Sequence, residues 1–193
     1  MDEAPEDRPR KRPSLTIRQM EIDDIAEVFH LGEDLFTASE WPNLYRTWDE
    51  YEVISLFQSD PELCLVAEIN DELAGFALGT TIEKSHSAWK YGYLVWLGVR
   101  PGNQRLGVAA RLFRTLRELL VEQGARIMLV DTEADNLPAL HFFRKQGFGN
   151  PQEHIFLTLN LDHQRRKNGE KKSATRANEP TRPAPEPSAP EVD

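Results

Sequence analysis

The apolar positions along the N-terminal half of the chain change their spacing several times, and each change predicts a new element. Residues 15–20 alternate as a strand, and a helical spacing follows at Ile22, Ile25, Phe29, Gly32 and Phe36. A connection over 37–46, which contains aromatic residues and a proline, leads to a second helix. The sequence Thr47-Trp48-Asp49-Glu50 has the form of a capping box for that helix, which is predicted to end near Asp60.

The remaining pattern predicts a sheet that alternates with helices. Residues 63–69 and 73–82 form a hairpin around Asn70-Asp71, and 91–99 is a central, largely apolar strand. A helix then opens at Gly107 and ends at Gly124, with one apolar face made by Val108, Leu112, Leu116, Leu119 and Leu120. The last predicted elements are a buried strand over 126–132, a helix from Asn136 to Gly147, and a closing strand over 154–161.

Composition limits this pattern to one domain, which we place at 14–162. The chain has 193 residues and is 39% hydrophobic, which suffices for a single core. Residues 1–13 and 163–193 hold eight of the 13 prolines, and we expect them to be disordered tails. The single cysteine, Cys64, lies in an apolar run and is expected to be buried. An acidic N-terminus and the absence of long apolar runs favour a cytoplasmic protein without a membrane segment.

The net charge of −9 conceals two regions of opposite sign. Residues 21–52 hold ten acidic side chains and one basic side chain, Arg46, whereas residues 100–126 hold six arginines and two glutamates. Such a contrast suits a cationic acceptor and a polyphosphate donor, since each field concentrates its counter-ion. For most of these residues individually, a solvated helix face explains the charge as well. The acidic domain argues against nucleic acid as a partner.

Residues 99–113 combine a strand end, a turn of small residues and a helix start. From Gln104 to Ala109 the order is Gln-x-x-Gly-x-Ala, which keeps bulky side chains away from the first helical turn. The N–H groups of that turn have no partners within the helix, and the helix dipole makes this end attractive to phosphate. By itself this segment is better explained as a helix entry that packs tightly against the sheet.

A second motif makes a phosphate site the better interpretation. Asn136-x-x-Ala139 is followed by the aromatic pair Phe142-Phe143 and then by Gly147-Phe148. Together the two motifs resemble the GNAT acetyltransferase superfamily, with some similarity to the ribosomal-protein alanine acetyltransferases that modify protein N-termini. The resemblance implies an α/β fold around a mixed sheet, in the order β-α-α-β-β-β-α-β-α-β, with the fourth and fifth strands parting to admit the donor.

The resemblance also implies that the donor is acetyl-coenzyme A, used without a metal, and that the acetyl group passes directly to a primary amine. The amine is expected to be a protein N-terminus or a small cationic molecule. Losing a proton at neutral pH costs a terminal amine about 1 kcal/mol but a lysine side chain about 4 to 5 kcal/mol. The predicted donor contacts are Leu97, Val99, Gln104, Arg105, Leu106, Gly107, Val108, Ala109, Ala110, Asn136 and Phe143.

Two acidic residues are candidates for the general base. Asp131 ends the strand that borders the predicted cleft. The resemblance matches it to a glutamate of the N-terminal acetyltransferases, whose side chain is one methylene longer than that of Asp131. A base and a loop-capping acid are equally good interpretations of Asp131. Glu133 lies one step further out, where a solvated turn residue is the better interpretation.

The usual proton donor of the family, a tyrosine seven residues after the motif asparagine, is absent. Phe143 stands at that position and has no hydroxyl, although a coenzyme A thiolate can leave without a donor. Tyr91 is the predicted substitute, with Tyr93 and Tyr45 as alternatives, although tyrosines that flank a buried strand are more often packing residues. His141 is expected to face solvent. A catalytically silent acyl-coenzyme A binding module is therefore the alternative function.

The acceptor is expected to bind at the connection that follows the first helix. The residues predicted to line it are Glu40, Trp41 and Tyr45, with Trp48 beside them. The two tryptophans can equally seal the edge of the core. We expect the protein to be a monomer or a homodimer.

Overall fold

The computed structural model describes residues 14–36, 48–83, 89–152 and 155. The chain divides into two units, Met1–Asn150 and Pro151–Asp193. Every helix and strand described below lies in the first unit. Of the predicted closing strand over 154–161, only Ile155 is among the described residues, and the predicted tails lie outside them. The domain boundaries at 14 and 162 therefore stay predictions.

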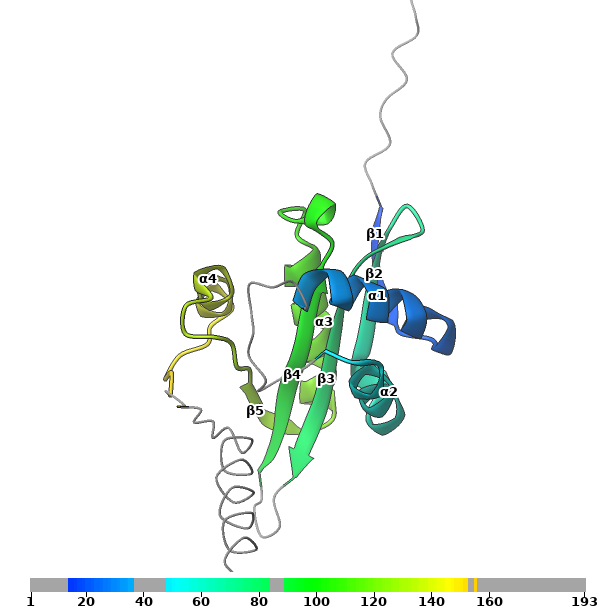
Figure 1. The fold of residues 1–193 in the computed structure, drawn as a ribbon. Helices are drawn as coiled ribbons and strands as arrows, with labels where there is room; N and C mark the ends of the chain where they lie inside the picture. The colour runs from blue at the N-terminus through cyan, green and yellow to red at the C-terminus, as the bar shows by residue number, and fades with distance from the viewer. Residues whose placement is uncertain (1–13, 37–47, 84–88, 153–154, 156–193) are drawn as a thin grey trace, which may run out of the picture. The chain divides into compact units, whose positions relative to one another are not determined.

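Five strands form one mixed sheet in the order β1-β2-β3-β4-β5 (Figure 1). They are β1 Leu15–Gln19, β2 Cys64–Ile69, β3 Glu72–Glu83, β4 Lys90–Val99 and β5 Ala125–Leu129. The first three pairings are antiparallel and β4 pairs with β5 in parallel. The predicted α/β fold with a mixed sheet is confirmed. Asn70 and Asp71 have φ values of 55° and 66° and so make the two-residue turn of the predicted hairpin.

Helices cover both faces of this sheet. The 3₁₀ turn η1 Ile22–Asp24, helices α1 Ile25–Phe36 and α2 Glu50–Ser59, and the turn η2 Pro61–Leu63 follow β1 in the chain. Helices α1 and α2 lie in front of the sheet in Figure 1, and α3 Val108–Glu122 lies behind it. Between β4 and α3 comes the 3₁₀ turn η3 Pro101–Asn103, and α4 Leu137–Lys145 follows β5.

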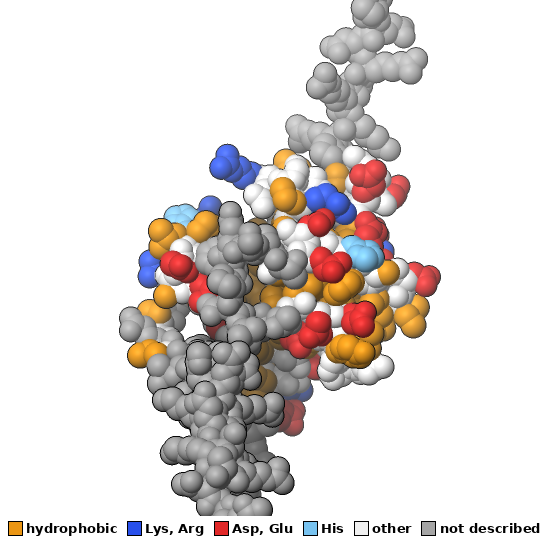
Figure 2. Space-filling view, in the orientation of Figure 1, with side chains coloured by type: hydrophobic (Ala, Val, Ile, Leu, Met, Phe, Trp, Pro, Cys, Tyr) orange, Lys and Arg blue, Asp and Glu red, His pale blue; other side chains and the backbone are white. Residues whose placement is uncertain are grey.

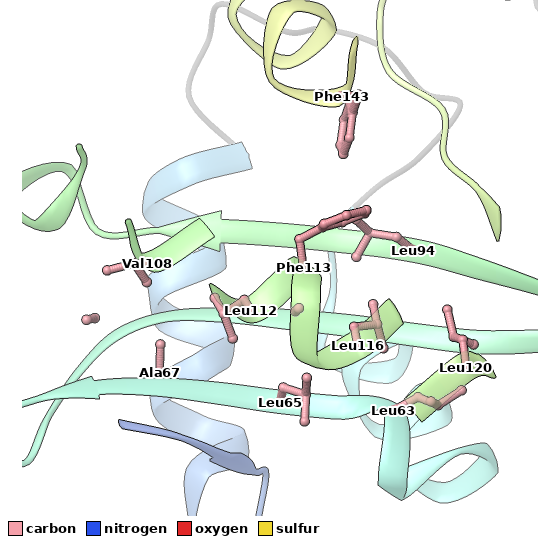
Figure 3. Packing of buried hydrophobic residues seen from close by; sticks show 12 residues of the cluster. Leu63, Leu65, Ala67, Leu94, Val108, Leu112, Phe113, Leu116, Leu120 and Phe143 are labelled. Carbon is pink, nitrogen blue, oxygen red and sulfur yellow. The ribbon is translucent and has the colours of Figure 1, made fainter. Parts of the chain in front are cut away.

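Each face of the sheet buries its own hydrophobic cluster. The cluster under α1 and α2 contains Val28, Trp48, Val53, Phe76 and Trp96. The cluster under α3 contains Leu65, Leu94, Leu112, Phe113 and Leu116, to which Phe143 of α4 is added (Figure 3). Each fully buried side chain of this size contributes about 1.5 to 3 kcal/mol. The sheet is thereby held as a rigid layer between the helices.

A bulge in β4 reverses which face its side chains occupy. Leu78 of β3 pairs with Trp96, but the next residue, Gly79, pairs with Leu94, so Val95 is an extra residue on β4. Leu94 packs in the cluster under α3, whereas Val95 and Trp96 both pack in the cluster under α1 and α2. Leu97 then returns to the α3 side. The sequence predicts 91–99 only as a central, largely apolar strand, and the bulge in the middle of it is a finding of the structure.

Three local predictions are wrong. Ile22 is 73% exposed, because it lies in η1 and the helix proper begins at Ile25. The N-cap of helix α2 is Asp49, whose carboxylate accepts a 2.8 Å hydrogen bond from Glu52 N, so the helix starts later than the predicted capping box implies; Thr47 lies outside the described residues. A carboxylate at this end also gains from the helix dipole. The strand predicted as buried over 126–132 ends at Leu129, which is 40% exposed, because β4 is its one strand partner among the described residues.

Most predicted helix ends are confirmed. Asn136 Oδ1 accepts a 3.2 Å hydrogen bond from Ala139 N at the start of α4, and Gly147, with φ of 99°, follows its end. Gly124, with φ of 86°, follows the end of α3. Cys64 is fully buried, as predicted. None of the helices described is both long and apolar enough to cross a bilayer.

Candidate active site

The predicted phosphate site, residues 104–110, forms the entry to α3 and is called the cradle below. Arg105 and Gly107 both have positive φ, 64° and 83°, so the backbone turns sharply before the helix starts. Gly107 is the N-cap of α3, and it has no side chain with which to cap the first-turn N–H groups. Val108 is the first residue of α3 and is buried in the cluster between this helix and the sheet, which fixes the start of the helix.

The surface of the cradle is open. Residues 104–107 are exposed and Ala109 and Ala110 are half-buried, so small side chains flank the first turn. A Cβ built on Gly107 meets no atom within 4 Å. Amides at the positive end of a 15-residue helix with free space before them fit a phosphate group. The residues present therefore suit the diphosphate that the sequence predicts.

Strands β4 and β5 part beside this site (Figure 1). Their pairing ends where Tyr93 is opposite Leu129, whereas β4 runs on to Val99 with β3 as its partner. Leu97 and Val99, both predicted donor contacts, lie on this continued stretch and are half-buried against the α3 cluster. Tyr93 and Val99 are six residues apart, about 20 Å along a strand. An extended ligand can therefore run from the cradle along β4 to the point where the strands part.

Two side chains meet at that point. The hydroxyl of Tyr93 donates a hydrogen bond of 2.5 Å to Oδ1 of Asp131. Tyr93 is the last β4 residue paired with β5, and Asp131 lies two residues beyond the end of β5. The candidate base is thus exposed and tied to a phenol across the opening between the strands.

The other residues near α4 have defined places. Glu133 is half-buried, and its carbonyl accepts a 3.1 Å hydrogen bond from Asn136 N in the turn before α4. Phe143 is 9% exposed, and its ring lies edge-on to Phe142 and Phe148 at 5.3 Å and 5.5 Å between centroids. Figure 3 shows Phe143 pointing from α4 toward the strand that carries Leu94. His141 is exposed, as predicted.

The predicted acceptor residues Glu40, Trp41 and Tyr45 lie outside the described residues. Trp48 is described and is 5% exposed, with its indole N–H donating a 2.9 Å hydrogen bond to Phe29 O. Its ring lies 5.1 Å from that of Trp96. Trp48 therefore belongs to the core, which was one of the two predicted roles.

Among the described residues, acidic side chains lie on the side of the sheet that α1 and α2 cover, and three arginines of α3 lie on the other side. Figure 2 shows Asp and Glu side chains spread over the face that α1 and α2 cover. Exposed Arg111, Arg114 and Arg117 lie on α3, behind the sheet. The regions approach each other where Arg100, directly after β4, comes within 3.5 Å of Glu27 of α1.

Sequence reasoning did not identify the partner of Asp131. Tyr91 and Tyr93 lie two residues apart on β4, and a period of two cannot choose between them. The choice depends on the register between β4 and β5, which places Tyr93 opposite the end of β5. Tyr91, opposite Ile127, stays a prediction.

The parallel pair of the mixed sheet parts beside an open helix N-terminus, which leaves room for an extended ligand along β4. Comparison with known proteins specifies the class: the model of the acetyltransferase (GNAT) family matches residues 34–148, and the chain belongs to this family. It is accordingly an acyltransferase.

Proteins similar to this chain in sequence or structure include acetyltransferases. An acetyltransferase of Yersinia pestis (strain Pestoides F) is 29% identical over 149 residues, which is 76% of this chain and 96% of that protein. Among solved structures, an aminoglycoside N-acetyltransferase, AAC(6')-Iy in complex with CoA, has a TM-score of 0.62 and 19% identity over 78% of this chain and 98% of that one. Ard1 from Thermoplasma volcanium has a TM-score of 0.58 and 22% identity over 72% and 84%. These structures share the fold.

Proposed function

We propose that this protein transfers an acetyl group from acetyl-coenzyme A to a primary amine, with Asp131 as the general base. The observation that supports this most is the position of Asp131. It stands where β4 and β5 part, hydrogen-bonded to the strand that leads directly into the cradle. A carboxylate and an anion site are thereby connected by one continuous piece of backbone.

On the donor side, the first-turn amides of α3 and the open space at Gly107 would hold the diphosphate. Arg105 is exposed in the same turn and supplies a positive charge. Leu97 and Val99 would lie along the extended arm. When bound, acetyl-coenzyme A supplies the activated acetyl group as a thioester. The known structure of a relative with CoA supports this choice of donor.

On the acceptor side, the base must remove a proton from an ammonium group. Losing that proton at neutral pH costs a chain-terminal amine about 1 kcal/mol and a lysine side chain about 4 to 5 kcal/mol. A terminal amine therefore needs less help from a single exposed carboxylate. The acidic face over α1 and α2 would attract a cationic acceptor. Aminoglycosides, which the names of several relatives mention, also carry amines.

The competing function is an acyl-coenzyme A binding module without turnover. Phe143 favours it, because a buried phenylalanine stands where the family resemblance implies a tyrosine as proton donor. The two functions make different predictions for the same assay, since only an enzyme releases free thiol when an acceptor is present.

Thiol release from acetyl-coenzyme A should be followed with a panel of peptides that have free N-termini, polyamines and aminoglycosides. The proposed function predicts release above the acceptor-free rate for at least one class, and a mass increase of one acetyl group on the amine. Asp131→Asn should reduce that rate by about 10²-fold or more while CoA binding persists. Binding without release for every acceptor would favour the silent module.

A further inference from the structure

The Tyr93–Asp131 contact is shorter than an ordinary hydroxyl hydrogen bond. Its 2.5 Å between Oη and Oδ1 is at the lower end of the range for an O–H donor on a carboxylate. The two residues come from separate elements and meet only because β4 and β5 part at this level. A proton donor and a proton acceptor are therefore in direct contact at one position.

Acetyl transfer to an amine is assisted by both groups, although a coenzyme A thiolate can also leave before it is protonated. The attacking nitrogen must lose one proton, and the leaving sulfur must gain one. Phe143 has no hydroxyl, so α4 offers no donor at the position where the family resemblance implies one. Tyr93 is half-buried on the strand that borders the opening, and its hydroxyl is already bonded to the proposed base.

We propose that Tyr93 is the proton donor of this enzyme and forms one proton-carrying unit with Asp131. This inference rests on the proposed function. The ammonium proton of the acceptor first passes through Asp131 to solvent. Oδ2 of the ionised Asp131 then accepts the second proton from the neutral attacking amine as the N–C bond forms, and the C–S bond breaks. Tyr93 Oη gives its proton to the sulfur and recovers one from the protonated Asp131. One proton moves from nitrogen to sulfur, and both side chains return to their starting state.

Tyr93→Phe tests this with little effect on folding, because a single hydrogen bond at an exposed position contributes about 0.5 to 1.5 kcal/mol. The matched control is Tyr51→Phe, which removes a hydroxyl from a 74% exposed tyrosine on α2. For wild type and both variants, kcat should be measured from acidic to strongly alkaline pH, with the best amine from the acceptor panel.

We expect Tyr93→Phe to lower kcat by about 10²-fold with little change in KM for acetyl-coenzyme A. The wild-type profile should fall at alkaline pH as the phenol ionises, and Tyr93→Phe should lose that fall. Tyr51→Phe should match wild type in both respects. A Tyr93→Phe enzyme with wild-type kcat, or one that keeps the alkaline fall, would overturn the inference.

A second measurement needs no activity. The ionisation of tyrosine is followed by ultraviolet absorption, and the curve of Tyr93→Phe subtracted from that of wild type isolates Tyr93. Asp131→Asn keeps an oxygen acceptor but removes the negative charge, so Tyr93 should ionise at lower pH in that background. An unchanged curve would show that the two groups do not share a proton. Wild type without turnover on any amine would overturn the proposed function as well, whereas an active wild type with an unaffected Tyr93→Phe overturns this inference alone.

Discussion

Gly32 of α1 lies directly against the indole ring of Trp48. A Cβ added to Gly32 would be 2.1 Å from both Cε2 and Cζ2 of that ring. The ring cannot move aside easily, because its N–H donates to Phe29 O on the same helix and it packs against the rings of Phe36 and Trp96. The absence of a side chain at position 32 is what lets α1 approach the aromatic cluster this closely.

Gly32→Ala should therefore destabilise the protein even though alanine is the better helix former. Overpacking typically costs about 1 to 3 kcal/mol, which exceeds the gain of about 1 kcal/mol in helix propensity. Chemical denaturation measures the free energy of unfolding. Gly149→Ala is the matched control, since a Cβ there meets nothing within 4 Å. Equal or greater stability of Gly32→Ala than of the control would contradict this contact.

Arg18 of β1 joins two acidic residues from different elements. Its guanidinium donates to both carboxylate oxygens of Asp24, at 2.6 Å and 2.8 Å, and to Glu68 Oε1 at 2.6 Å. The hydrogen bonds from Arg18 are the main reason that the pKa of Asp24 is lowered, and the backbone N–H of Glu21 adds to the effect. Asp24 thus stabilises the fold while it is ionised.

The sign of the pH dependence follows from that lowered pKa. The contribution of Asp24 is complete above the pKa of an aspartate in the unfolded chain, about 3.9, and is lost as the pH falls through the lower pKa of the folded state. Asp24→Asn should lose about 1 to 3 kcal/mol at neutral pH and less at acidic pH. Denaturation curves across this range measure the difference, with the exposed neighbour changed in Asp23→Asn as a control. A loss that does not shrink with acidity would refute the assignment.

Cys64 should be chemically inert in the folded protein. Burial raises the pKa of its thiol to about 12, and the charges of Asp60 and Glu62 add to the effect. Because the thiolate is the reactive form, an alkylating reagent should modify Cys64 only after denaturant is added. Mass spectrometry after timed labelling measures this. Rapid modification under native conditions would show that β2 opens locally.

Local rules predict much of this fold. Several predicted features depend only on residues a few positions away. They are the turn at Asn70-Asp71, the cap at Asn136, and the helix ends at Gly124 and Gly147. The burial of Cys64 likewise follows from the short apolar run in which it lies. Such features are encoded in short segments, so a single sequence reveals them.

The features that define the candidate site depend on register instead. The bulge at Val95 arises from how β4 pairs with β3, and nothing in the largely apolar sequence of 91–99 marks it. Tyr93 meets Asp131 only because the pairing of β4 with β5 ends at Leu129. Trp48 and Trp96 come together in the core from segments far apart in the sequence, and no local pattern around either residue indicates that contact. Contacts between distant segments are therefore what the sequence pattern leaves open.

The two ends of α3 provide a matched test of the cradle. Gly107 and Gly124 have φ values of 83° and 86°, and a Cβ at either position meets nothing within 4 Å. Any side chain at either position costs about 1 to 2 kcal/mol of backbone strain, so Gly107→Glu and Gly124→Glu should destabilise the protein to a similar extent. They differ in location: the first places a carboxylate at the cradle, and the second at the opposite end of the helix.

Gly107→Glu should weaken the binding of CoA, measured by titration calorimetry, by at least about tenfold. The reason is that two like charges about 4 Å apart near a protein surface repel by about 4 kcal/mol. Gly124→Glu should bind CoA with nearly the wild-type affinity despite its equal strain. Gly107→Ala separates the two effects, because it adds the strain without the charge and should retain most of the affinity. If both glutamate variants bound CoA equally well, the diphosphate would have to lie elsewhere than at residues 104–110.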